Sequence, residues 1–123
     1  MSENLTKYVL LGIRVFLALA FAAAGLAKLA GVQMLVDEFA VVGLGQWFRY
    51  VTGLIEIGSA VLLWVPGLTA IGAGLEVCVV LGALLAHLTV LGMATSAGVF
   101  VLGPLAAITL WVNRAQLQRF LPA

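Results

Sequence analysis

The chain has 123 residues, of which 64% are hydrophobic and only 9% are charged, and its formal net charge is +1. Soluble domains carry about 25% charged residues, so this much apolar surface cannot be buried in a core of the chain's own size and must face lipid. The small net charge gives no reason to expect nucleic-acid binding. The single cysteine, Cys78, excludes an internal disulfide and a thiolate metal cluster. We predict one membrane domain over residues 1–123, with no metal site and no intrinsic cofactor.

Apolar stretches long enough to cross a bilayer predict four transmembrane helices, over residues 8–29, 48–65, 68–91 and 98–112. The segment between the first two is too short and too polar to cross. Its apolar residues recur at helical spacing, and they are Val32, Leu35, Val36 and Phe39. The polar residues Gln33, Asp37 and Glu38 lie opposite, which predicts a short amphipathic helix in the membrane interface. The predicted fold class is all-α: an integral membrane four-helix bundle with an interfacial amphipathic segment between helices 1 and 2.

Four spans place both termini on the same side of the membrane. That side carries Lys7, Arg114 and Arg119, whereas the other side carries Arg49 and the head of Lys28. The positive-inside rule therefore places both termini in the cytoplasm, with the chain in the plasma membrane or, in a bacterium, the inner membrane.

Five ionisable side chains lie inside or at the ends of the predicted spans. They are Arg14, Lys28, Glu56, Glu76 and His87. A charge at mid-membrane costs roughly 2.5–3.5 kcal/mol on insertion scales, so such groups must be paired or used. Each lies on a helix face that also carries small residues, and small residues let helices pack closely in lipid. We expect these faces to line the interior of the bundle.

Depth along the helices predicts which of these groups meet. At about 1.5 Å per residue, Arg14 and Glu76 lie at a similar depth below the terminal side, which predicts one intramembrane ion pair. Lys28 and Glu56 lie together near the opposite side, and His87 belongs to that layer. Lys28, Glu56 and His87 are the candidates for ligand binding or proton relay. The alternative is structural, because buried ion pairs can fix helix register without any ligand.

Several short motifs are shared with one known family. They are Ala24-Gly25-Leu26-Ala27-Lys28-Leu29, Phe39 with Gly43-Leu44-Gly45, Gly53-Leu54-Ile55-Glu56-Ile57-Gly58-Ser59-Ala60, and Gly82-Ala83 followed by His87-Leu88. In this order and spacing, residues 9–112 resemble the DoxX-like family of small four-helix integral membrane proteins. The resemblance implies a compact membrane bundle and a shared polar site at Lys28, Glu56 and His87. Glu76 departs from the family pattern.

The family resemblance implies a mixed set of functions, among them a quinone-reducing oxidoreductase subunit, membrane partners of oxidative-stress enzymes and receptor-assembly chaperones. We expect an accessory or scaffold membrane subunit associated with a redox system, partnered by lipid, by a soluble or membrane oxidoreductase or by a second copy. The alternative is a subunit that binds a quinone-like or lipid-like molecule. Proton-coupled transport comes third, since four spans show no inverted repeat. Whether the chain is an enzyme stays open, and no catalytic residue is assigned.

Overall fold

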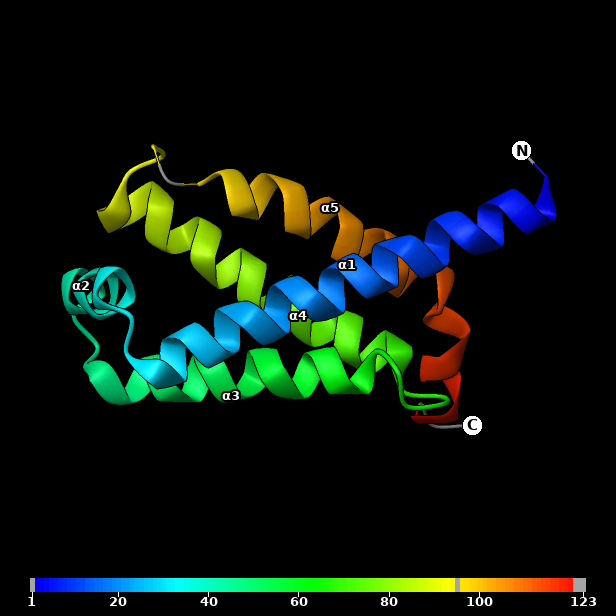
Figure 1. The fold of residues 1–123 in the computed structure, drawn as a ribbon, viewed down its shortest axis with the longest axis horizontal. Helices are drawn as coiled ribbons and strands as arrows, with labels where there is room; N and C mark the ends of the chain where they lie inside the picture. The colour runs from blue at the N-terminus through cyan, green and yellow to red at the C-terminus, as the bar shows by residue number, and fades with distance from the viewer. Residues whose placement is uncertain (1, 95, 121–123) are drawn as a thin grey trace.

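The computed structural model describes residues 2–94 and 96–120, and Figure 1 shows their arrangement. Its elements, in chain order, are α1 (Glu3–Ala30), α2 (Gln33–Val42), α3 (Gln46–Leu62), α4 (Thr69–Ala86), the π-helical turn η1 (His87–Leu91), α5 (Ala97–Val112) and the 3₁₀ helix η2 (Arg114–Phe120). No strand occurs within these described ranges. The all-α prediction is therefore confirmed.

Two helices are long and apolar enough to cross a membrane: Glu3–Ala30, and Thr69–Leu91, in which η1 continues α4. A third candidate arises if α5 and η2, which meet at a bend of 61°, are counted as one span. At about 1.5 Å per residue the 17 residues of α3 reach only about 25 Å, below the thickness of a typical hydrocarbon core. The described helices thus support an integral membrane protein.

The long helices pack side by side in a fixed order. Helix α1 packs against α3, α3 against α4, and α4 against α5, while α5 also touches α1. Helix α2 lies across one end of this group, where it contacts α3 and η1 (Figure 1). The start of α1 and η2 both lie at the other end, where Arg119 Nη2 donates to Gly67 O over 2.9 Å.

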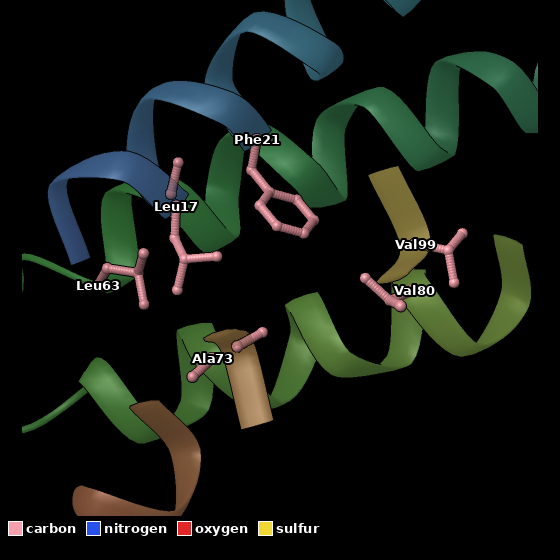
Figure 2. Packing of buried hydrophobic residues seen from close by; sticks show 8 residues of the cluster. Leu17, Phe21, Leu63, Ala73, Val80 and Val99 are labelled. Atoms are coloured by element: carbon pink, nitrogen blue, oxygen red, sulfur yellow. The ribbon is translucent and has the colours of Figure 1, made fainter. Parts of the chain in front are cut away.

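Aliphatic and aromatic side chains form one core between the four long helices (Figure 2). Leu17 and Phe21 of α1 point toward α4, which contributes Ala73 and Val80. Leu17 and Ala73 are fully buried, and Phe21 is 2% exposed. Most other large apolar side chains are exposed, which is the reverse of a soluble protein and the arrangement expected where lipid covers the outside.

Glycines bring the helix backbones into direct contact near the polar residues. A Cβ added at Gly25 of α1 would lie 2.6 Å from Gly53 O of α3, closer than real Cβ atoms approach. A Cβ added at Gly72 of α4 would lie 2.8 Å from Ser59 O of α3. Only glycine permits these approaches, so the distances between α1, α3 and α4 are set by main-chain contact.

Candidate functional site

The end of α1 is built around a buried arginine from the next long helix. Gly31, with φ of 76°, caps α1 in the left-handed conformation that favours glycine. Arg49 of α3 is 5% exposed, and its Nη1 donates to Lys28 O at the last turn of α1. Its Nε donates to Gln46 Oε1 over 2.8 Å. Arg49 thus adds a charged donor to a carbonyl in the last turn of α1, whose backbone partner, Gly31 N, lies 3.3 Å away.

Lys28 and Glu56 form an ion pair between α1 and α3. Lys28 Nζ lies 2.7 Å from Glu56 Oε1, and the side chains are 14% and 4% exposed. The pair lies one turn from the contact between Gly25 and Gly53, which holds the two helices at the distance the pair requires. The structure thus brings together the two residues that depth and helix face paired in the sequence.

A buried hydroxyl leads from this pair toward Glu76. Ser59 Oγ lies 2.8 Å from the Glu56 main-chain carbonyl and 3.3 Å from Glu76 Oε2. Glu76 is fully buried, and its Oε1 has no hydrogen-bond partner in the described part of the chain. Lys28 of α1, Glu56 and Ser59 of α3 and Glu76 of α4 therefore form a polar row between the helices. Within it Ser59 contacts the Glu76 carboxylate but reaches Glu56 only at its main-chain carbonyl.

Arg14 does not reach Glu76. No salt bridge joins these two residues in the described ranges, and the Arg14 guanidinium lies 4.4 Å from the centre of the Trp64 ring. Trp64 follows the end of α3, so it occupies the space beside Arg14 at the terminal end of the molecule. Cation–π contact replaces the ion pair that depth alone predicted, and Glu76 packs on Ser59 instead.

His87 begins the π-helical turn that ends the third long helix. Its ring is 9% exposed, and Nδ1 lies 2.8 Å from Gly92 O. A carbonyl oxygen only accepts, so Nδ1 carries the proton in this contact and Nε2 has no protein partner among the described residues. The turn is closed by Gly92 N donating to His87 O over 3.0 Å. Single π turns inside α-helices occur often at functional sites.

A cavity of about 550 Å³ lies beneath α2, between α3 and α4–η1. Its walls are mainly apolar side chains from α2, α3, α4 and η1. Its polar and ionisable lining residues are Lys28, Glu38, Thr52, Cys78, His87 and Thr89. The Thr52 and Thr89 hydroxyls both donate to helix carbonyls, over 2.8 Å each. Lys28, Glu38 and His87 are therefore the groups left to orient a bound molecule.

The three sequence-predicted candidates meet this cavity differently. Lys28 and His87 line it, whereas Glu56 lies behind Lys28 and holds the ammonium group in place. Sequence reasoning missed two residues. Glu38, assigned to the polar face of α2, lines the cavity. Arg49, assigned to the membrane surface, is buried beside Lys28. The available signal was its position in the first turn of the second predicted span, on the same side of the membrane as Lys28.

The chain belongs to the DoxX-like family, whose model matches residues 13–112. The match covers most of the chain and includes all the residues described above, from Arg14 to His87. No curated protein and no solved structure matched the sequence. Family membership and the apolar helices together identify a small membrane protein.

Proposed function

We propose that the chain is an accessory integral membrane subunit that binds an amphiphilic molecule, quinone-like or lipid-like, in the cavity beneath α2. The observation that carries the proposal is the cavity itself, which is mostly apolar and has Lys28 and His87 in its wall. Binding sites for small molecules are apolar clefts of about 300–1,000 Å³ with a few polar groups that orient the ligand. The volume of about 550 Å³ falls within that range.

The polar groups suit a quinone headgroup in either redox state. The Lys28 ammonium keeps N–H donors beyond the one aimed at Glu56, and a quinone carbonyl accepts such a bond. His87 Nε2 offers an acceptor for a quinol hydroxyl, because Nδ1 is engaged with Gly92. Together with the polar row through Glu56, these groups could pass a proton between ligand and protein. The proposed association with a redox system rests on this chemistry and on the oxidoreductase members of the family.

The proposal includes a membrane arrangement. If α1 and α4–η1 cross the bilayer, then α3 and α5, which pack between and beside them, share the same hydrocarbon layer and complete a four-helix bundle. Helix α2 then lies in the interface, since its half-buried Phe39 and Val42 line the cavity while Gln33 and Asp37 are exposed. The basic residues at the terminal end favour cytoplasmic termini in a plasma or inner membrane.

The test measures ligand binding to the purified protein in detergent, with ubiquinone-10 and a phospholipid as the two probes. The His87→Ala variant should lose quinone affinity, measured by quenching of tryptophan fluorescence, while it keeps the helical signal and melting temperature of the parent. Leu88→Ala is the matched control, because Leu88 is 63% exposed on the same π turn and does not line the cavity. Ala86→Leu, which adds volume inside the cavity, should reduce binding of either probe.

A scaffold role is the second candidate, and outward-facing glycines favour it. A Cβ added at Gly12, Gly58 or Gly98 would meet no atom within 4 Å, so each leaves a flat patch on the outside of a long helix. Small residues let membrane helices of two proteins, or two copies of one, approach closely. If neither ubiquinone nor phospholipid responds to His87→Ala and Ala86→Leu, the cavity proposal is refuted and the scaffold role is preferred.

A further inference from the structure

A second groove lies at the opposite end of the molecule from α2. It has a volume of about 580 Å³ and runs between the first three turns of α1 and the last turn of α5. Its polar and charged lining residues are Glu3, Asn4, Thr6, Lys7, Arg14, Thr109 and Asn113. We call it the terminal groove. It shares no residue with the cavity beneath α2, so the two sites can be tested separately.

Two cations in the terminal groove have no acidic partner. Lys7 and Arg14 lie on the same face of α1, seven residues or about 10 Å apart. Neither forms a salt bridge in the described residues, although Glu3 lines the same groove. Arg14 is half-buried and stacks on Trp64, but no hydrogen bond connects its guanidinium to another described residue. Arg14 thus lines the groove with N–H donors that have no acceptor among the described residues.

The groove also has an apolar side that is open to lipid. Leu10 and Leu11 of α1 and Val112 of α5 line it, and Leu11 and Val112 are 38% and 48% exposed on the outer surface. A molecule that fills this groove thus meets cations and amide groups toward the end of the helices and hydrocarbon-facing side chains beside them. Such a surface fits a phosphate group that carries an acyl chain.

Other features of this end place it at a membrane interface. Trp64 and Trp111 each stack with an arginine here, with Arg14 at 4.4 Å and Arg114 at 3.9 Å from the ring centre. Tryptophan is enriched where the hydrocarbon core meets the headgroups. Phosphates of the lipids lie at this same level, and anionic lipids attract basic side chains close to the surface.

We propose that the terminal groove binds one anionic phospholipid through its phosphate, with Arg14 and Lys7 as the two cationic contacts. The Asn113 amide donates one hydrogen to Thr109 O, and its second hydrogen is a further donor for the phosphate. Arg14 lies deeper and presents a planar set of N–H groups that matches two phosphate oxygens. Lys7, nearer the start of α1, supplies a point charge at the outer side of the same phosphate. Leu11 and Val112 then contact the first part of the acyl chain.

The test is native mass spectrometry of the detergent-solubilised full chain titrated with phosphatidylglycerol, phosphatidylcholine or inorganic phosphate. The parent protein should bind one phosphatidylglycerol more tightly than phosphatidylcholine. A basic group near a membrane surface contributes about 1 kcal/mol toward an anionic lipid, so Lys7→Gln and Arg14→Gln should each weaken phosphatidylglycerol binding about fivefold. Lys7 is exposed, so its variant tests the proposal even if Arg14→Gln folds poorly.

Arg114→Gln is the charge-matched control, since Arg114 is exposed at the same end but does not line the groove. It should change phosphatidylglycerol affinity less than about twofold. Equal binding of the two lipids would refute the proposal, as would equal losses in Lys7→Gln and Arg114→Gln. Saturable binding of inorganic phosphate as tight as that of phosphatidylglycerol would show that the groove takes a free anion, and would refute the lipid assignment.

Discussion

Replacing Glu56 by glutamine should destabilise the protein far more than the same change at an exposed acid. Glu56 is 4% exposed and supplies the anionic partner of Lys28, whose Nζ lies 2.7 Å away. Glu56→Gln keeps the shape of the side chain but leaves the Lys28 ammonium in a largely apolar interior without a counter-charge. The variant thus isolates the charge of the pair from its packing.

The expected loss follows from breaking one half of a buried pair, which costs about 3–5 kcal/mol in the free energy of unfolding. Lys28 is 14% exposed at a helix end, so part of the loss is relieved by its head moving toward water, and we expect the lower end of that range. Replacing both residues, as in the double variant Lys28→Met with Glu56→Gln, removes the unpaired charge and should restore much of the loss.

Reversible unfolding in mixed micelles by sodium dodecyl sulfate, followed by circular dichroism, measures these differences. The matched control is Asp37→Asn, because Asp37 is exposed on α2 and only accepts a hydrogen bond from Gln33 over 2.8 Å. The control should change the free energy of unfolding by less than about 0.5 kcal/mol. The reasoning is wrong if Glu56→Gln costs no more than Asp37→Asn, or if the double variant with Lys28→Met is the least stable of all.

Three further predictions use the same purified protein or intact cells. Gly25→Ala should cost about 1–3 kcal/mol in the free energy of unfolding, because the added methyl group meets the α3 backbone. Gly12→Ala, the control, should be neutral or stabilising. Equal effects of the two variants in the same unfolding assay would contradict the glycine contact. Arg49→Met should cost about 1.5–3 kcal/mol, since it removes charged hydrogen bonds at the end of α1, and a loss below about 0.5 kcal/mol would show that water replaces them. In a Cys78→Ser background, a cysteine at Gln33 should react with a membrane-impermeant maleimide added outside intact cells; protection there would count against an interfacial α2 on the side opposite the termini.

Helix periodicity and depth predicted the Lys28–Glu56 pair because both quantities constrain the same contact. The two residues lie at one depth, and small residues mark the faces that meet. Arg14 and Glu76 met the same two conditions, yet they form no salt bridge in the described ranges. Which neighbour lies beside Arg14 depends on how the chain leaves α3, and there Trp64 occupies the space. The spacing of residues along one helix shows which of them share a face, but not which neighbouring element that face meets in the bundle.

The remaining differences arise at helix ends. Every helix ends with carbonyl groups that need a donor from outside the helix, but the sequence does not show which side chain supplies it. Arg49, which donates to Lys28 O at the end of α1, was therefore assigned to the surface. The π turn at His87 has no hydrophobic period of its own that distinguishes it from α-helix. Glu38 was grouped with the polar face of α2, yet it lines the cavity together with Phe39 and Val42. The cavity is therefore lined by residues at the boundary between the polar and apolar faces of this helix as well as by the apolar face.

The backbone contact between Gly25 and Gly53 has a consequence for what the cavity can accept. Main-chain atoms in direct contact have no rotamers to adjust, so α1 and α3 cannot separate or slide locally to fit a larger headgroup. Lys28, three residues further along α1, has four rotatable side-chain bonds. If the proposed ligand binds here, only the flexible Lys28 side chain can adjust to headgroups of different size at this wall, while the spacing of α1 and α3 stays the same.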